Sequence, residues 1–545
     1  MNKKGWYIGI MVLSSGWLFA QGEMDAYRFS QTELNGTARS MSMGGAFGAL
    51  GGDMSVMSHN PAGLGVYRSS EVQATLNLSM ANMSSNWTGI NRSQNRTRFN
   101  FDNLSYVGYF PTGYDTGIKG WNFGVSYHRV KNFYRTYQAV GNPKHSLADY
   151  TAAMATNARK DGGIPERDLK ANDPYQNSKL SAHWLSILGY QSGFFGTKYK
   201  WNDVYHSGFG EYDGSGIWNP ASPKEAMMNI RESGWISEYN FSASLNISDY
   251  VFLGATLGLS DINYRLYSKH DEDFGGGDYL FMENALETNG TGYSLNTGVI
   301  VRPAQAFRFG VAYNSPKWYK MTDFAYARGE SYIKAYTDKP KMEGKTPTGT
   351  FHYSYRSPDR WIFSMAGIIG TSALISVDYE LTNYKAMRLG NEDATEYYDD
   401  ITMQVKRDFK IGQTLKVGAE YRVTPQFAIR GGYVWQPSPM QETLTLGKQE
   451  VFTAGTVTHY TIAGQTHYYT VGLGYRFTPN FYMDLACIYR TQQEYLYPFS
   501  NVFIKDARYH IKPVNAEPAK VTANTTRLAL TLGYKFCGTR NRPKR

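Results

Sequence analysis

The chain has 545 residues, 42% of them hydrophobic, and a mean hydropathy of −0.47. After the first twenty residues no stretch approaches the roughly 18 apolar residues that a membrane-spanning helix needs, which excludes a helical membrane protein. The net charge of +10 comes from 56 basic and 46 acidic residues, and the basic residues are scattered singly, so we expect no nucleic-acid partner. The 44 Tyr and 55 Gly residues give residues 70–536 a uniform strand-like texture, which predicts one large all-β unit.

The first twenty residues have the pattern of a secretory signal peptide. A short basic region, residues 1–4, precedes an apolar run over residues 5–20, and Ala20 ends the run at a cleavage point. A membrane anchor is the alternative, but the run is short and serines interrupt it. The two cysteines, Cys487 and Cys537, match no spacing of a disulfide framework or a metal site, so we expect neither metal nor cofactor.

The next segment, residues 21–70, lacks the pattern of a strand. Residues 35–66 are dense in Gly, Ala, Ser and Met. The segment ends in a motif formed by Asn60, Pro61, Ala62, Gly63 and Leu64. Pro61 fixes its own φ and biases Asn60 away from helix, while the Asn60 amide can close a turn. The motif therefore predicts a locked turn, with an ordinary Asn-Pro turn leading into the first strand as the alternative.

From residue 71 onward, apolar and polar residues alternate strictly over stretches of nine to eleven residues, which predicts β-strands. In residues 527–536, Leu528, Leu530 and Leu532 share one face, and Thr531 lies on the other. Fourteen strands are predicted, at residues 71–81, 97–110, 119–131, 234–247, 250–264, 291–302, 305–317, 349–367, 371–384, 412–423, 426–436, 466–477, 480–491 and 523–536.

Short turns and long loops alternate between these strands. Turns built on Pro, Asn or Asp include residues 423–427 and 477–481. The long connections are residues 131–232, 262–290, 320–348, 386–411, 437–465 and 492–522. This sorting is typical of an outer-membrane barrel, whereas a soluble β-sandwich, the alternative, has no reason to sort its loops.

We therefore predict an all-β fold, a monomeric 14-stranded antiparallel transmembrane β-barrel over residues 71–536 in the bacterial outer membrane, with a basic periplasmic tail at residues 537–545. The even strand number places both ends of the mature chain on the periplasmic side, where the short turns lie. Residues 21–70 then begin at the periplasmic mouth and are predicted to fold into the lumen as a hatch or plug.

These features resemble the FadL family of outer-membrane transporters of long-chain fatty acids and other hydrophobic compounds, in a form like that of Bacteroidetes members. The resemblance rests on the predicted hatch at residues 36–64 with its Asn60-Pro61-Ala62 turn, and on Tyr355-Arg356-Ser357-Pro358 leading into residues 361–367. The chain departs from the family in the excursion of about 100 residues between the third and fourth strands and in the nine-residue tail.

The resemblance implies passive uptake of a hydrophobic molecule, which enters an apolar lumen pocket and leaves sideways through the barrel wall. By resemblance the third strand supplies the lateral gap, with Asn122, Gly124 and Ser126 as its candidate positions. Gly124 lies inward and has no side chain to pack, which weakens a strand. Two alternatives stay open: a secretion or assembly partner resembling the PorV-type subunit of type IX secretion, and a haem-related receptor.

Basic side chains on inward faces are candidate lumen cations. They are Arg308, Lys416, Arg422, Arg430, Arg476 and Arg527. A guanidinium fork suits a carboxylate, so in the family interpretation one or two of them meet a fatty-acid headgroup. The alternative is that charged side chains in the lumen pair with each other, for example with Glu420, or bind water.

The long excursion contains two apolar stretches, residues 146–158 and 180–190. The second supplies a candidate outer capture patch formed by Trp184, Leu185, Ile187 and Leu188. An exposed apolar patch often marks a binding surface, so we predict first capture of the ligand there. A loop helix packed on its own neighbours is the alternative.

Enzyme signatures are absent from the sequence, since GxSxG, HExxH, P-loop and GxGxxG motifs do not occur. Residues 270–273, His-Asp-Glu-Asp, are interpreted as a solvated acidic turn, with contact to a divalent cation or lipopolysaccharide as the alternative. A lipid hydrolase whose triad comes from distant strands stays an open alternative. We expect no enzyme, and we expect a hydrophobic small molecule and outer-membrane lipid or lipopolysaccharide as partners.

Overall fold

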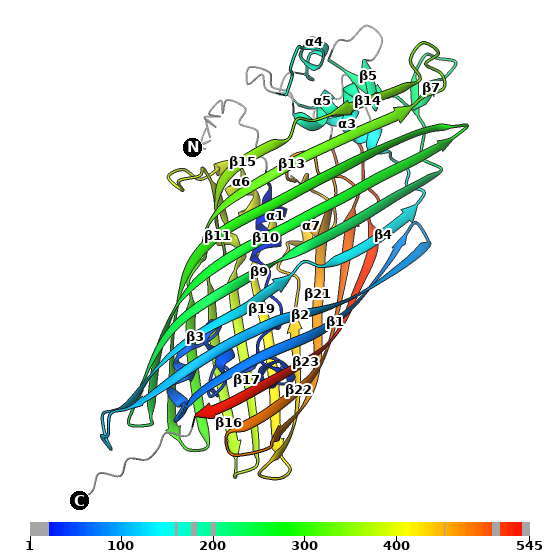
Figure 1. The fold of residues 1–545 in the computed structure, drawn as a ribbon. Helices are drawn as coiled ribbons and strands as arrows, with labels where there is room; N and C mark the ends of the chain where they lie inside the picture. Colours follow the sequence, from blue (N-terminus) through cyan, green and yellow to red (C-terminus); the bar gives the residue numbers. More distant parts are fainter. Residues whose placement is uncertain are drawn as a thin grey trace, which may run out of the picture.

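The fold is that of a computed structural model, which describes residues 21–158, 162–175, 183–197, 203–451, 453–503 and 513–536. One 19-stranded antiparallel sheet closes on itself where β1 pairs with β23 (Figure 1). Strands that continue one another along the wall form a single stave, and the staves number fourteen, which confirms the predicted barrel. The predicted signal peptide and the basic tail with Cys537 lie outside the described residues.

Each of the fourteen predicted strands overlaps one stave. In order around the barrel the staves are β1 (Ser70–Trp87), β2 (Ile90–Pro111), β3 (Ile118–Asn132) continued by β4 (Arg135–Gly141), β9 (Glu225–Ile247), β10 (Val251–Gly275), β11 (Asp278–Ala304), β12 (Phe307–Asn314) continued by β13 (Trp318–Tyr332), β14 (Lys341–Lys345) with β15 (Gly349–Arg356) and β16 (Arg360–Ile369), β17 (Ala373–Asn383) continued by β18 (Arg388–Gly390), β19 (Ile411–Arg422), β20 (Phe427–Gln436), β21 (Tyr460–Arg476), β22 (Phe481–Tyr497) and β23 (Ala519–Phe536).

Outward and inward positions alternate along the staves, as the sequence predicts. On β23, Leu528 and Leu532 are 45% and 42% exposed, whereas Ala529 and Thr531 are buried. The exposed outer face is apolar because it meets lipid, and the inward face meets the contents of the lumen.

Short turns join the staves at one end of the barrel, here called the base and drawn at the bottom of Figure 1. The turn between β9 and β10 consists of Ser248, Asp249 and Tyr250, and the φ angles of Ser248 and Asp249 are +53° and +61°. Asn246 stabilises this left-handed turn, since it accepts a 2.9 Å hydrogen bond from Asp249 N and donates a 2.8 Å bond to Asp249 Oδ1. The other end of the barrel carries the long connections and is called the long-loop end.

One predicted long loop, residues 262–290, is instead a tall hairpin. β10 and β11 stay paired from the base up to Asp273 and Tyr279, and the turn between them lies at Gly275–Gly277, three glycines with positive φ. The loop prediction is wrong because inward Ile262, Tyr264 and Leu266 continue the alternation and pack into the apolar core at the long-loop end.

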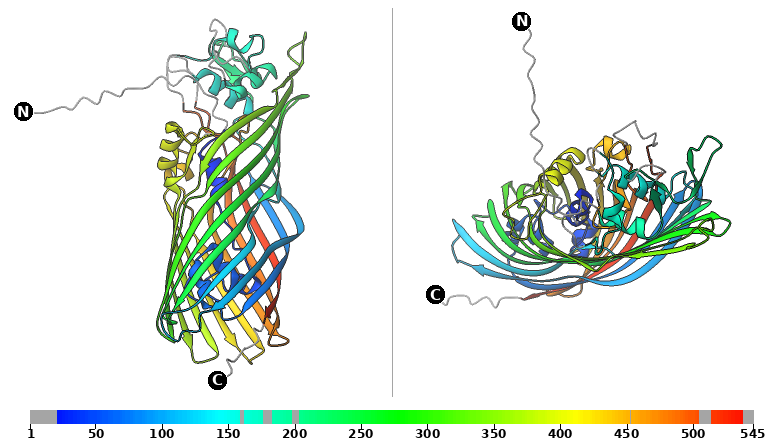
Figure 2. Two further views of the ribbon diagram at one scale, coloured as in Figure 1. Left: turned by 60° about the vertical axis from the view of Figure 1, so that its left-hand side comes forward. Right: turned by 90° about the horizontal axis from the view of Figure 1, so that it is seen from above.

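Helices and short strands cap the long-loop end, as Figure 2 shows from the side and from above. The helices are α3 (Leu147–Thr156), α4 (Glu166–Leu169), α5 (Trp184–Gln191), η3 (Tyr384–Ala386), α6 (Asp399–Asp408) and α7 (Glu442–Thr445), and the short strands are β5 (Phe195–Thr197), β6 (Tyr205–Ser207), β7 (Gly210–Tyr212) and β8 (Trp218–Pro220). In the described part of the chain no helix has the length and apolar character to cross a membrane.

Two neighbouring staves are interrupted by proline at the same level of the wall. Pro316 separates β12 from β13, and Pro358 separates β15 from β16. Proline lacks the N–H that a ladder needs, which explains the interruption. Ser357 bridges it, because its backbone N–H donates to Lys317 O at 3.0 Å and its hydroxyl accepts from Lys317 N at 2.8 Å. The Tyr355-Arg356-Ser357-Pro358 motif therefore forms a break in the wall.

The N-terminal segment, residues 21–67, lies inside the barrel and is drawn in dark blue in Figure 1. Its elements are α1 (Glu23–Ser30), α2 (Ala38–Ser42), η1 (Met54–Ser58) and η2 (Pro61–Val66). The expectation that it begins at the periplasmic mouth is wrong. Gln21 donates to Asp323 Oδ2 at 3.0 Å and Ala26 O accepts from Tyr355 Oη at 2.8 Å, both in the long-loop half. The segment begins there because apolar Tyr27 and Phe29 are buried in the core of that half.

Candidate functional site

The Asn60 turn seats the N-terminal segment against the wall near the base. The Asn60 side chain caps η2 by accepting from Ala62 N at 3.2 Å, and it donates to Gly48 O at 2.6 Å and Val299 O at 3.4 Å. Pro61 follows as the first residue of η2, where its missing N–H has no cost. The turn is therefore locked within the segment and also bonded to stave β11.

Glycines on the inner wall let the segment's backbone approach the strands closely. A Cβ built on Gly298 would lie 1.9 Å from Asn60 Oδ1, and one on Gly254 would lie 2.2 Å from the carbonyl carbon of Pro61. Seven staves each contribute one glycine whose added Cβ would fall within 2.6 Å of the segment, here called the glycine belt: Gly124, Gly254, Gly298, Gly310, Gly418, Gly432 and Gly472. The wall and the segment are thus complementary in shape at backbone level.

The candidate lumen cations are occupied by protein partners where they lie deepest. Arg430 binds Glu420 at 2.7 Å and Asp484 at 2.5 Å, Lys416 forms an ion pair with Glu380, and Arg527 donates to Leu34 O at 2.6 Å. Their contacts match the alternative interpretation, in which lumen charges pair with one another.

The remaining candidate cations lie nearer the base. Arg308 donates to Leu50 O of the N-terminal segment. Arg422 and Arg476 line a polar cavity at the base mouth, where the Arg422 side chain is 55% exposed and 3.8 Å from Glu420. Glu420 also accepts a 2.9 Å bond from Arg39 of the segment, so this mouth is bridged by charges rather than open to an apolar ligand.

A central cavity lies between the segment and the wall at the level of the proline breaks. Its lining includes Glu238, Lys317, Arg360, Glu380 and Lys416. Lys317 pairs with Glu238, and Arg360 lies 3.7 Å from Glu380. The expectation of an apolar lumen pocket is wrong for this cavity, because paired charges occupy its walls.

The barrel wall splits between β2 and β3 in the long-loop half. The two strands are paired without interruption from Pro111 with Gly120 to Asn103 with His128. Above this point β2 is paired with β1 only, and β3 and β4 are paired with β9 only, within the described residues. Asp102 is an extra residue in β2, and the register of β3 shifts between Arg129 and Lys131. Bulges on both strands therefore separate the wall at one level.

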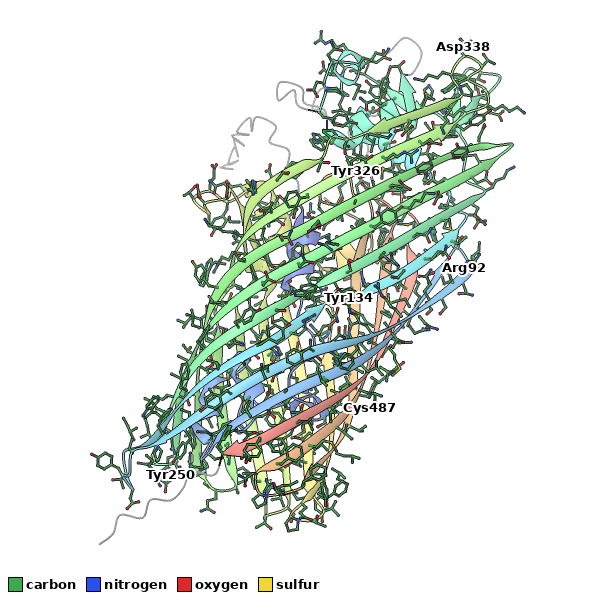
Figure 3. All side chains as sticks on the ribbon, viewed as in Figure 1. Arg92, Tyr134, Tyr250, Tyr326, Asp338 and Cys487 are labelled. Atoms are coloured by element: carbon green, nitrogen blue, oxygen red, sulfur yellow. The ribbon has the colours of Figure 1, made fainter. Side chains whose placement is uncertain are left out.

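No backbone ladder crosses this split, and each hydrogen bond across it involves a side chain. Asn132 Nδ2 donates to Asn100 Oδ1 at 3.0 Å, Arg96 donates to Thr136 Oγ1 at 3.1 Å, and Ser85 Oγ of β1 donates to Gln138 O of β4 at 2.5 Å. Figure 3 shows Tyr134 at the split, between β2 and the β3–β4 junction. Bonds of this kind can exchange without breaking a strand ladder, in contrast to those of the paired strands elsewhere in the wall.

The candidate gap positions Asn122, Gly124 and Ser126 lie below the split, where β3 is paired on both sides. The prediction that they form a gap is wrong. Gly124 belongs to the glycine belt, where its added Cβ would lie 2.6 Å from Met57, and Asn122 donates to Leu64 O at 2.8 Å. The third strand borders the split, which begins above His128 at the level of the bulge after Arg129 and not at the inward glycine.

A second cavity, here called the side cavity, lies at the split. Its lining joins the split strands to the lumen and contains six arginines, Arg96, Arg98, Arg129, Arg135, Arg490 and Arg527, against two acids, Glu33 and Asp102. The sequence analysis did not single out the arginines of β2. Arg92, Arg96 and Arg98 are separated by even numbers of residues and therefore lie on one face of that strand. This pattern could have identified the arginine-rich face from the sequence.

Buried ion pairs link the N-terminal segment to the split. Glu232 of β9 pairs with Arg135 of β4 and lies 3.9 Å from Arg28 of α1. Arg135 also binds Glu494 of β22 at 2.8 Å, and Tyr264 donates to Glu232 at 2.7 Å. The residues after α1 continue this link, since Glu33 lines the central cavity, the side cavity and the two smaller cavities between them.

The candidate capture patch is not exposed. Leu185, Ile187 and Leu188 of α5 are buried, and the Trp184 ring packs at 5.8 Å from Phe351. The prediction of an exposed patch is wrong, because α5 packs its apolar side chains against α3 and the β13–β14 hairpin.

The interpretation of residues 270–273 as a solvated turn is also wrong. These residues lie on β10, and His270 and Glu272 are buried and 2.8 Å apart. Glu272 accepts a 2.8 Å bond from Leu147 N and a bond from the Ser146 hydroxyl. The carboxylate thus caps the N-terminus of α3, a position that stabilises negative charge.

Comparison with known proteins supplies the family. The family model described as outer membrane protein transport protein (OMPP1/FadL/TodX) matches residues 276–536. The matched part of the chain therefore resembles the FadL family. The fold of the barrel is similar to that of a Pseudomonas aeruginosa FadL homologue, at 13% identity and a TM-score of 0.51 over 93% of this chain and 99% of that chain.

Two toluene transporters are also similar in structure. TodX of Pseudomonas putida is 10% identical, with a TM-score of 0.47 over 93% of this chain and 100% of that chain. TbuX of Ralstonia pickettii is 12% identical, with a TM-score of 0.47 over 92% of this chain and 99% of that chain. No curated protein matches this chain.

The family match gives the compartment and the broad activity. The barrel is an outer-membrane protein, and the family that its residues 276–536 match consists of outer-membrane transport proteins.

Proposed function

We propose that the protein takes up long-chain fatty acids or similar hydrophobic compounds passively, and that the ligand leaves sideways through the split between β2 and β3. In this proposal residues 21–67 act as the hatch. An apolar ligand gains free energy by entering lipid and loses it by entering the aqueous periplasm, so a lateral exit suits its chemistry.

The observation that carries the proposal is the split beside a filled lumen. Across the base, the glycine belt holds the segment against seven staves, which blocks a straight path to the periplasm. At the split no backbone ladder joins β2 to β3 and β4, and the wall is closed by hydrogen bonds that each involve a side chain. An exit through the wall at the split therefore requires fewer contacts to be broken than an exit through the base.

Residues 31–35 lie between the central cavity and the split. Gln31 and Glu33 line both the central cavity and the small cavities next to it, and Glu33 and Asn35 line the side cavity. A shift of this short stretch would join the cavities into one passage. The moving part of the hatch in this proposal is the stretch after α1, and the Asn60 turn stays in place.

A disulfide across the split tests the exit. In a background without native cysteines, Asn100→Cys with Asn132→Cys replaces a 3.0 Å side-chain contact that bridges the split. Oxidation should abolish uptake of a labelled long-chain fatty acid in cells, and a reductant should restore it. The matched control is Asn263→Cys with Asn289→Cys, which replaces a 2.8 Å contact between β10 and β11, strands that are already paired.

Two results would count against the route. Full uptake with the split cross-linked would show that ligand leaves elsewhere, and equal loss in the control pair would trace the effect to general stiffening. Wild-type uptake in every variant, including Asn60→Ala, with normal amounts at the surface, would instead favour a secretion or assembly partner, for which the capped long-loop end offers a surface.

A further inference from the structure

The side cavity has an excess of positive charge that the protein itself does not neutralise. Of its six arginines, Arg135 is bound by Glu232 and Glu494, Arg527 by Leu34 O and Asn35, and Arg490 by the side-chain oxygen of Gln492. Arg96, Arg98 and Arg129 have no carboxylate within 4 Å among the described residues. The charge of the cavity therefore differs from that of the central cavity, where Lys317 and Lys416 are paired with acids.

The unpaired guanidinium groups lie close together at the split. The guanidinium group of Arg98 lies 3.1 Å and that of Arg96 5.3 Å from the centre of the Tyr134 ring. Two like charges therefore lie against one aromatic ring. Arg129 donates to Tyr127 Oη at 2.9 Å and lies 5.3 Å from the Trp235 ring. Like charges this close are unfavourable in a low-dielectric wall unless an anion joins them.

The outer rim of the split is apolar and aromatic. Phe99 is 63% exposed on the outer face of β2, and Phe101 stacks on Tyr127 of β3 with 5.8 Å between ring centres. Phe99 follows Arg98 directly and Phe101 comes two residues after Phe99, and both side chains lie on the face of the strand opposite to Arg98. A molecule seated here meets Arg96 and Arg98 on the inner side, and aromatic rings together with Arg129 on the lipid side.

We propose that the side cavity binds the oxyanion headgroup of an anionic amphiphile, whose apolar chain lies in the membrane against Phe99, Phe101 and Tyr127. A carboxylate and a phosphate both accept paired N–H bonds from guanidinium forks, which is the chemistry that Arg96, Arg98 and Arg129 supply. The headgroup belongs either to a transported acid on its way out or to a resident membrane lipid. The inference deepens the proposed function, and rests on it only for the direction of transport.

Binding measurements with matched chains test the site. The full-length protein in phosphatidylcholine nanodiscs is titrated by equilibrium dialysis with radiolabelled laurate, dodecyl phosphate and the neutral dodecanol. We expect tighter binding of the two anions than of dodecanol. Arg98→Gln should weaken anion binding about tenfold, the loss of one charge-assisted hydrogen bond, and leave dodecanol unchanged.

Two further variants separate the site from general effects. Arg92→Gln is the matched control, since Arg92 shares the strand and face of Arg98 but lies outside the cavity lining, toward the tip of the β1–β2 hairpin (Figure 3). Arg129→Gln tests the opposite side of the split should Arg98→Gln fail to assemble. Equal affinity in wild type and both cavity variants, or the same loss in Arg92→Gln, would overturn the proposal.

The two sources of the headgroup give different results. A resident lipid predicts an anionic phospholipid or lipopolysaccharide that co-purifies with wild type and is lost in Arg98→Gln, with uptake unchanged. A transported acid predicts reduced uptake of laurate with normal uptake of a neutral hydrocarbon. If the split disulfide fails to block uptake while anion binding depends on Arg98, the proposed route falls and the site stands; the reverse pair of results removes the site and keeps the route.

Discussion

The two ends of the N-terminal segment are held in the barrel by different physical means. Near the base, the Asn60 turn and the residues before it fit against the glycine belt, where the segment's backbone and side chains lie directly on the backbone of the wall. In the long-loop half, α1 is held by the ion pair of Arg28 with Glu232 at 3.9 Å and by packing of Tyr27 on Phe409, with 5.3 Å between ring centres. A shape fit of this kind has one arrangement, whereas ion pairs can exchange partners, so the difference places any movement of the segment at α1 and residues 31–35.

The largest effect should come from filling the glycine belt. Gly298→Leu places a side chain where Asn60 Oδ1 already lies 1.9 Å from the position of the new Cβ, so the segment cannot seat. We expect a loss of about 3 kcal/mol in the free energy of unfolding, measured by urea denaturation followed by heat-modifiable gel mobility. Gly367→Leu is the control, since its added Cβ meets no atom within 4 Å. Equal stability of the two variants would show that the belt does not hold the segment.

A smaller effect should follow Asn60→Ala. This change removes the cap on Ala62 N and leaves Gly48 O without its 2.6 Å donor. The expected loss is about 2 kcal/mol, because a buried carbonyl loses its partner and a helix loses its cap. Chemical denaturation measures the loss, and protease digestion of residues 43–66 reports whether the turn has loosened. Digestion at the wild-type rate would contradict the assigned role of Asn60.

The other end of the segment should respond more weakly to Arg28→Gln. Arg28 loses its 2.5 Å pair with Asp25 and its position 5.1 Å from the Tyr264 ring, but Glu232 keeps Arg135 and Tyr264 as partners. We expect a loss of about 1 kcal/mol. Hydrogen exchange should quicken in residues 23–30 and stay unchanged in residues 61–66. Faster exchange at both ends would mean that the segment moves as one body, which breaks the comparison.

The smallest effect concerns a charge cluster at the base, where Asp249 binds Lys119 at 2.8 Å and also pairs with Arg68, just after the segment. Burial by itself raises the pKa of Asp249, but the bonds from Lys119 and Asn246 and the charge of Arg68 outweigh it and lower the pKa from 3.8 to about 2. A lowered pKa stabilises the folded protein above about pH 4, and this contribution is lost as the pH falls toward 2.

Because this cluster is partly exposed, the contribution of Asp249 is a few tenths of a kcal/mol. Asp249→Asn should flatten the dependence of unfolding free energy on pH between about pH 4 and 2, compared with wild type under the same detergent conditions. A pH profile that stays as steep in the variant would assign the dependence to other carboxylates.

The sequence predicted the barrel well because alternation is a local property. The alternation within one strand shows which face Leu528, Leu530 and Thr531 occupy. The short turns at one end and the long loops at the other then predict a closed barrel with an even number of strands. The tall β10–β11 hairpin was missed because polar outward residues such as Lys269 and Asp271 resemble those of a loop, although inward Leu266 continues the pattern.

The candidate site was predicted only in outline, because its contacts join residues far apart in the chain. Arg430 and Arg527 were placed in the lumen correctly, but their partners Asp484 and Leu34 depend on the register of distant strands. The start of the segment was misplaced since the burial of Phe29 depends on a core built mostly from loops. The split arises from two bulges, at Asp102 and after Arg129, and residue patterns do not disclose a bulge.

The seam at which the barrel closes is also a binding surface for the segment. β1 and β23 meet there, Thr75 and Thr531 share a 2.8 Å hydrogen bond across the seam, and Thr531 Oγ1 accepts a 2.7 Å bond from Ala38 N of the segment. Binding of the segment in the lumen and pairing of β1 with β23 therefore favour each other. The free energy of binding the segment contributes to the free energy of closing the barrel. In a barrel assembled without its first 67 residues, unfolding should become less cooperative, and the pairing of β1 with β23 should be lost before any other strand pairing in the wall.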